Sequence, residues 1–77
     1  MITKKDILRE ARILKDRFPE YRMGQAVFNY VNLHPELFGN AARISQFNYG
    51  VDCFYKDDMI DQFIDQVLDI VNNQFID

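Results

Sequence analysis

Residues 57–77 read DDMIDQFIDQVLDIVNNQFID, and this stretch has the clearest periodicity in the chain. Its apolar side chains recur at steps of three and four residues, which places them on one broad face of a helix. They are Met59, Ile60, Phe63, Ile64, Val67, Leu68, Ile70, Val71 and Phe75. Asp57 or Asp58 suits the N-cap, because a carboxylate there accepts free backbone N–H groups. So wide an apolar face needs a cover, and we expect the preceding residues to supply it.

The same stretch carries a second, acidic pattern. Asp57, Asp61, Asp65 and Asp69 follow one another at a step of four residues, which stacks them on one side of the helix. We call these four residues the acidic ridge. Its simplest interpretation is a solvated face that keeps the helix in solution. The alternative is nucleic-acid mimicry, because carboxylates one turn apart lie roughly 6 Å from each other, comparable to successive phosphates.

Length and composition indicate one small domain, residues 1–77, near the lower size limit for a self-supporting core. The content of hydrophobic residues, 48%, is high enough to form such a core. The single cysteine, Cys53, excludes an intramolecular disulfide, and no signal peptide is visible, so we expect a reducing cytoplasm. No apolar run approaches the roughly 20 residues that span a bilayer. We therefore expect a soluble monomer or weak homodimer without membrane association.

Charge is unevenly distributed along the chain. Residues 1–22 hold seven basic and four acidic side chains, whereas residues 23–77 hold two basic and eight acidic ones. In the fold, these charges either cancel between neighbouring helices or form two faces of opposite sign. Acidic residues interrupt the basic N-terminal part and the whole chain is acidic, so we do not expect direct binding of nucleic acid.

A first helix is expected to begin at a capping box of Thr3 and Asp6 and to end at about Phe18, before Pro19. Its apolar residues should be buried. They are Ile7, Leu8, Ala11, Ile13, Leu14 and, at the end, Phe18.

A second helix is expected from Tyr21 or Arg22 to His34, which precedes a proline and is therefore disfavoured in a helix. Its core face consists of Met23, Ala26, Val27, Tyr30 and Val31. Gly24 is tolerable in a first turn and would let another helix approach closely.

The next segment allows two interpretations. Pro35 suits the first position of a new helix, because its missing N–H would have no partner there. Gly39 then either closes a single turn or lies inside a longer helix that reaches Ile44. If it closes a turn, Asn40 can cap a second short helix, Ala41–Ser45.

Residues 46–56, QFNYGVDCFYK, are expected to form an ordered loop held by its aromatic side chains, because Asn48, Gly50 and Asp52 favour turns. Residues 51–55, VDCFY, could pass for a strand, but nothing else in the chain offers a partner strand. The predicted fold class is all-α, a small bundle of three main helices plus a short helix or ordered aromatic loop.

Residue types that catalysis and metal binding require are scarce. The chain holds one serine, Ser45, one threonine, Thr3, one histidine, His34, and one cysteine. Cys53 with His34 is the only thiol–base pair, and a core cysteine with an exposed or capping histidine is the simpler interpretation. The chain has neither a CxxC nor an HxxxH spacing, and its three glycines are isolated. We expect no enzyme, no cofactor and no metal.

Aromatic residues are dense between residues 38 and 55. They are Phe38, Phe47, Tyr49, Phe54 and Tyr55. Most should belong to the core, but one or two should reach the surface, the tyrosines first, where they would suit a protein interface. An acidic rim at the start of the last helix would favour a basic partner. The predicted partner-binding residues are Tyr49, Tyr55, Phe47, Asp57 and Asp61.

Three segments resemble one group of known proteins. They are Arg22-Met23-Gly24-Gln25-Ala26-Val27-Phe28-Asn29, Pro35-Glu36-Leu37, and Asp52-Cys53-Phe54-Tyr55 before an acidic helix. The pattern is similar to that of short bacteriophage and prophage proteins that carry R-x-G-Q-A-x-F-N, P-x-L and D-P-F-Y segments. Cys53 stands in place of proline, and the segment between Ile44 and Asp52 is longer than usual in the group. The resemblance implies a small helical fold of phage or mobile-element origin, and it implies no site residues.

Compact phage proteins of this kind often bind a host or viral protein. Together with this resemblance, the sequence predicts a non-enzymatic phage-type protein in the host cytoplasm. It would bind and modulate, for example inhibit, another macromolecule, in the first place a host or viral protein. The alternative is an acidic nucleic-acid mimic of the anti-defence type that acts through the acidic ridge.

For the core, we expect one face of the last helix to pack on the first two helices. That contact would join Ile60, Phe63, Ile64, Val67 and Val71 to Leu8, Ile13, Leu14, Val27 and Val31.

Overall fold

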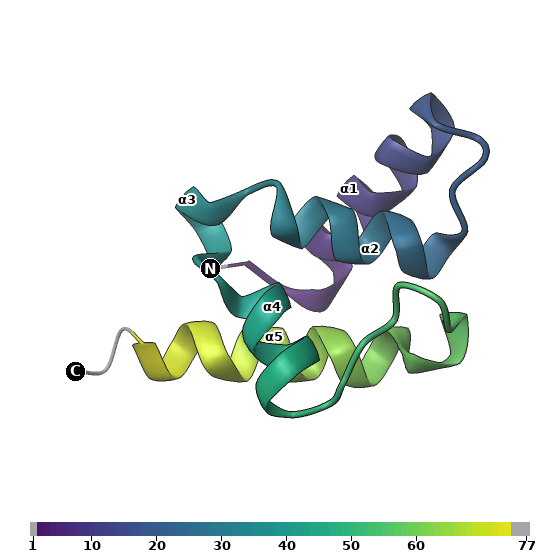
Figure 1. The fold of residues 1–77 in the computed structure, drawn as a ribbon. Coiled ribbons are helices and arrows are strands. Elements are labelled where there is room, and N and C mark those ends of the chain that lie inside the picture. The colour runs from purple at the N-terminus through teal and green to yellow at the C-terminus, as the bar shows by residue number, and fades with distance from the viewer. Residues whose placement is uncertain (1, 75–77) are drawn as a thin grey trace.

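Five α-helices and one 3-10 helix, joined by loops, lie within residues 2–74, the part of the chain that the computed structural model describes (Figure 1). They are α1 (Lys4–Arg17), α2 (Met23–Asn32), α3 (Pro35–Phe38), α4 (Ala41–Asn48), the 3-10 helix η1 (Asp57–Met59) and α5 (Ile60–Gln74). No strand occurs among these residues, so the predicted all-α fold class is confirmed. Phe75, counted above in the apolar face of the last helix, lies outside the described residues.

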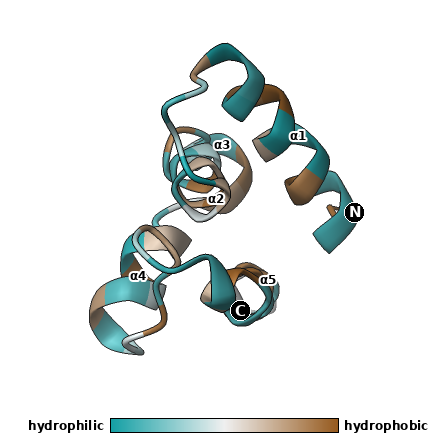
Figure 2. Cartoon of the chain, turned by 90° about the vertical axis from the view of Figure 1, so that its right-hand side faces the viewer, coloured by the Kyte–Doolittle hydropathy of each residue, from teal (hydrophilic) through white to brown (hydrophobic). Residues whose placement is uncertain are grey.

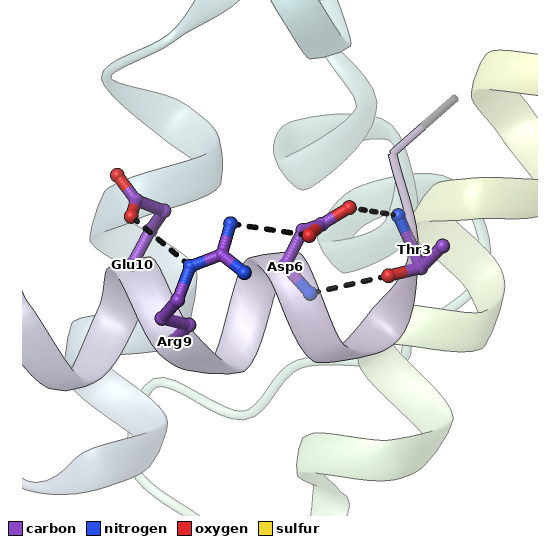
Figure 3. Close-up of polar contacts among 4 residues, drawn as sticks. All are labelled: Thr3, Asp6, Arg9 and Glu10. Atoms are coloured by element: carbon purple, nitrogen blue, oxygen red, sulfur yellow. Dashed lines mark hydrogen bonds and ion pairs between the residues drawn. The ribbon is translucent and has the colours of Figure 1, made fainter.

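The predicted capping box starts α1 (Figure 3). The Asp6 backbone N–H donates to Thr3 Oγ1 at 3.2 Å, and the Thr3 N–H donates to Asp6 Oδ2 at 2.9 Å. These two bonds satisfy N–H groups that the first turn of a helix leaves without partners. The bond from the Thr3 backbone holds the pKa of the Asp6 carboxyl below its usual value.

α2 is the central helix of the bundle. Figure 2, in which α2 and α5 are seen nearly end-on, shows α1 on one side of α2 and α4 with α5 on the other. Ala26, Val27 and Val31 of α2 are completely buried. A helix covered on two sides must be apolar on two sides, and this explains why α2 contributes so many core residues.

The apolar face of α5 is buried as predicted at its centre. Phe63, Ile64 and Val67 have no exposed surface, whereas Ile60 and Val71 are half-buried. The cover differs from the predicted one, because α4 contacts α5 more extensively than α1 does. The sequence pattern of α4 is short and therefore did not indicate this role.

The apolar residues of α1 are less buried than predicted. Ile7 and Ala11 are completely buried, but Ile13 is 49% exposed and Phe18 is 41% exposed. Ile13 is six residues after Ile7 and therefore points about 120° away from it around the helix axis. The prediction that Ile13 packs against the last helix was wrong. The apolar residues of α1 extend around more of the helix than its main neighbour, α2, covers, and Ile13 lies outside the covered side.

Residues 35–48 form two helices, which is the first of the two interpretations. α3 is a single turn that ends at Gly39, whose φ of 58° lies in the left-handed region that favours glycine. α4 continues to Asn48, so Phe47 lies on a helix and not in a loop as predicted. A single Asn does not stop a helix, and the next left-handed residue is Gly50, with a φ of 69°. The Asn40 side chain precedes α4 without capping it.

Candidate functional site

Three large aromatic side chains are exposed on one continuous segment of the chain. Phe47 is 72% exposed, Tyr49 is 58% exposed and Tyr55 is 75% exposed. We call residues 47–55 the aromatic segment. The sequence predicted one or two exposed aromatic residues here, and the structure has three of them. Aromatic side chains are enriched at protein interfaces relative to the rest of the surface.

Polar groups of α4 hold the first half of the aromatic segment. The buried Ser45 hydroxyl donates to the Val51 carbonyl at 2.8 Å, and the Val51 N–H donates to the Ser45 carbonyl at 3.0 Å. Gln46 Nε2 donates to Asp52 Oδ2 at 2.8 Å, while Asp52 Oδ1 accepts from the Phe54 N–H at 2.8 Å. The loop was predicted to be held by its aromatic rings, but side-chain hydrogen bonds form much of its framework, and the bond between Asp52 and Phe54 is of the Asx-turn type.

The second half of the segment docks on the N-terminus of α2 at Gly24. The Gly24 N–H donates to Asp57 Oδ1 at 2.9 Å, and the Cys53 thiol donates to the Gly24 carbonyl at 3.2 Å. A β-carbon on Gly24 would overlap the Cys53 carbonyl oxygen. Gly24 therefore permits a close approach as predicted, although the approaching chain is a loop and not a helix.

Arg22 positions the tyrosine at the end of the segment. Its guanidinium donates to the Phe54 carbonyl at 2.9 Å and lies 5.8 Å from the centroid of the Tyr55 ring. The Phe54 ring packs edge-on against Phe28 of the core at 5.6 Å and against Tyr55 at 4.8 Å. Tyr55 is thus exposed and still held in place on two sides. Arg22 was not among the predicted binding residues, and its place at the start of the R-x-G-Q-A-x-F-N segment was the one signal for it.

The predicted acidic rim has partners within the chain. Asp57 lies in η1, before α5 begins, and its carboxylate caps α2 instead of the last helix, so it does not continue the acidic ridge. Lys4 Nζ lies 3.8 Å from Asp61 Oδ1 and 3.0 Å from Asp65 Oδ1. The hydrogen bond to Asp65 raises the pKa of the Lys4 ammonium. Charges from the basic and acidic parts of the chain therefore cancel in part between α1 and α5.

Two shallow depressions flank the aromatic segment. One has a volume of about 150 Å³ and is lined by Gly50, Asp52, Tyr55, Lys56 and Met59. The other has a volume of about 530 Å³ and is lined by Val51, Gln62, Asp65, Gln66 and Asp69. The carboxylates that line these depressions are those of Asp52, Asp65 and Asp69, so the structure does not place the predicted rim residue Asp61 there.

The one thiol–base pair in the chain is not assembled. Cys53 contacts the first turn of α2, whereas His34 follows its last turn, and a helix of ten residues is about 15 Å long. His34 Nδ1 instead lies 3.0 Å from Glu36 Oε2.

Among the described residues, no group of three or more His, Cys, Asp or Glu side chains could hold a metal ion. No helix within residues 2–74 is long and apolar enough to cross a membrane.

Burial raises the pKa of the Cys53 thiol from 9.0 to about 12, and the nearby Asp52 carboxylate adds to the shift. We expect a disulfide reagent at about pH 8 to modify the native protein only as fast as the protein unfolds, and to modify it rapidly in urea. Because the folded pKa is the higher one, the neutral thiol stabilises the fold below pH 9.0, and this contribution is lost as the pH rises toward 12. Labelling kinetics followed by mass spectrometry measure the rate. Rapid modification of a protein with unchanged circular dichroism would contradict this prediction.

Comparisons with protein-family models, with curated proteins and with solved structures gave no match. The resemblance to short phage proteins therefore remains a prediction from the quoted segments. Two of those segments contact each other in the fold, where Arg22 and Gly24 meet Cys53 and Phe54.

Proposed function

We propose that this protein is a non-enzymatic binding protein that attaches to another protein through the aromatic segment and thereby changes the activity of its partner. The exposure of Phe47, Tyr49 and Tyr55 on a segment held by defined contacts is the observation that carries this proposal. Aromatic side chains supply a large contact area with little loss of rotamer entropy, and they dominate binding energy at many protein interfaces. A segment that is already ordered loses less entropy on binding than a flexible loop does.

The sequence resemblance supports a host or viral protein as the partner, and the single reduced thiol supports an action in the reducing cytoplasm. The carboxylates of Asp52, Asp65 and Asp69 beside the segment favour a partner with a basic surface. Such charges at the edge of an interface mainly accelerate association. The separation of Cys53 from His34 supports a role without catalysis.

We expect Tyr55→Ala and Tyr49→Ala each to weaken partner binding by about 2 kcal/mol, which is about thirtyfold in Kd. Each tyrosine is removed from an exposed position, so the fold should remain intact. The partner is first recovered with the immobilised protein from a bacterial lysate at low and at high salt, and Kd values of the variants are then measured by calorimetry. Leu37→Ala, an exposed apolar residue outside the aromatic segment, is the matched control and should bind as wild type does. Normal binding by both folded tyrosine variants would refute the proposal.

The nucleic-acid mimic is the second candidate, and the exposure of the Asp61 and Asp65 side chains, 79% and 66%, favours it. The use of Asp57 as a cap and the position of Lys4 weaken it, because fewer carboxylates remain for a partner. Charge reversal of Asp61, Asp65 and Asp69 distinguishes the two candidates. A mimic would lose its binding in these variants and would bind less tightly as salt increases, whereas the tyrosine variants would bind normally.

A further inference from the structure

A second exposed apolar area lies in a groove between α1 and α2, on other elements than the aromatic segment. The groove has a volume of about 230 Å³, with Ile13 and Leu14 of α1 on one wall and Tyr30 of α2 and Leu33, the residue that follows α2, on the other. Ile13 is 49% exposed and Leu33 is 64% exposed. Two large aliphatic side chains this exposed beside one groove indicate a contact surface.

The charged residues of this groove are arranged symmetrically on α1. Glu10 precedes Ile13 by three residues, and Arg17 follows Leu14 by three residues. The order charged, apolar, apolar, charged is therefore the same from either end of the helix, and the two end charges have opposite signs. Glu10 and Arg17 are seven residues apart, about two turns, and therefore lie on the same side of the helix.

Both charges are available for contacts with another molecule. Glu10 Oε2 lies 3.7 Å from Arg9 Nε, and Arg9 is closer to Asp6, at 3.1 Å (Figure 3). Arg17 takes part in none of the ion pairs found among residues 2–74. Among the described residues, neither Glu10 nor Arg17 forms an ion pair with another helix.

We infer that a second copy of this chain occupies the groove, in a two-fold symmetric dimer whose α1 helices pack antiparallel. The two-fold axis passes α1 between Ile13 and Leu14, which sets Glu10 of each copy against Arg17 of the other. A symmetric interface uses the same patch on both subunits and must be complementary to itself. The pattern from Glu10 to Arg17 meets this condition in charge and in apolar contact. The inference does not rest on the proposed function, because the aromatic segment remains outside the interface.

Sedimentation velocity over a concentration series from about 10 µM to about 1 mM, a range that covers weak dimerisation, tests the inference. The wild-type protein should shift from monomer to dimer with rising concentration and stop there, because a two-fold interface closes on itself. Leu33→Asp should abolish the shift, since it places a charge on an apolar wall. Phe47→Ala, which changes an exposed residue outside the groove, should leave it unchanged.

Charge variants test the pairing itself. Glu10→Arg and Arg17→Glu should each weaken self-association by about tenfold, because two-fold symmetry places the resulting like-charge contact in the dimer twice. The double variant Glu10→Arg/Arg17→Glu should regain the wild-type shift. An equimolar mixture of the two single variants should also associate, since every Arg then faces a Glu. Circular dichroism confirms that each variant is folded.

A wild-type protein that stays monomeric throughout the series would overturn the inference. Association that the charge variants leave unchanged, or that continues past the dimer, would also overturn it, because the contact would then lie elsewhere. Binding of the partner recovered through the aromatic segment is measured separately, so failure of one proposal leaves the other to be judged on its own data.

Discussion

Phe63→Ala is expected to leave the protein mostly unfolded at room temperature. The Phe63 side chain is completely buried, and its ring lies 5.5 Å from that of Phe28 of α2, so it joins the last helix to the central one. Truncation of a buried Phe costs about 3–5 kcal/mol, from lost transfer free energy and from the cavity that remains. A single domain of this size has a free energy of unfolding of only a few kcal/mol. The substitution should therefore remove most of the free energy of unfolding.

Urea and thermal melts followed by circular dichroism measure this effect. Phe47→Ala removes the same side chain from a position that is 72% exposed, and it should change the free energy of unfolding by no more than about 0.5 kcal/mol. Both variants replace Phe with Ala, so the difference between their free energies of unfolding reports the effect of burial and not of residue type. A cooperative melt of Phe63→Ala close to that of the wild-type protein would show that the core face of α5 has been assigned wrongly.

Gly24→Ala is expected to destabilise the protein by about 2–3 kcal/mol, which is the opposite of its effect on an isolated helix. Helix propensity alone favours alanine over glycine by about 1 kcal/mol. The new β-carbon, however, would overlap the Cys53 carbonyl oxygen and would lie 2.8 Å from Asp57 Oδ1. The loop would have to move, and the thiol contact and the cap of α2 would be lost with it.

Gln25→Ala is the neighbouring control, because it also places an alanine in the first turn of α2, where glutamine and alanine differ in helix propensity by only a few tenths of a kcal/mol. Thiol labelling supplies a second measurement. In folded Gly24→Ala, Cys53 should react faster than in the wild-type protein, since the displaced loop no longer shields it. A Gly24→Ala variant that is as stable as the wild-type protein, with equally slow labelling, would show that the loop does not depend on this close approach.

The density of aromatic residues predicted where the aromatic segment lies, but it did not predict which residues hold the segment in place. Tyr49 and Tyr55 are exposed as expected, but Phe47 is exposed as well, and its exposed fraction is larger than that of Tyr49. Arg22 positions Tyr55 through the Phe54 carbonyl, 32 residues later in the chain. Ser45 of α4 holds the loop through Val51, six residues later. No periodic pattern marks such residues, because each acts through one or two specific contacts and not through a face that repeats along a helix.

Sequence by itself determined the local structure of this protein. The capping box at Thr3 follows from interactions within a few residues, and the buried centre of the last helix follows from a period of 3.6 residues. The sequence left open whether the helix that begins at Pro35 ends at Gly39, and the structure shows that it does. Only the tertiary structure decided which side of α1 is covered and where Asp57 binds. The Asp57 carboxylate looks like a cap for the helix that follows it, yet it accepts from Gly24, 33 residues earlier in the chain. A carboxylate can cap any helix start that packing brings within reach, and packing depends on the whole set of apolar faces.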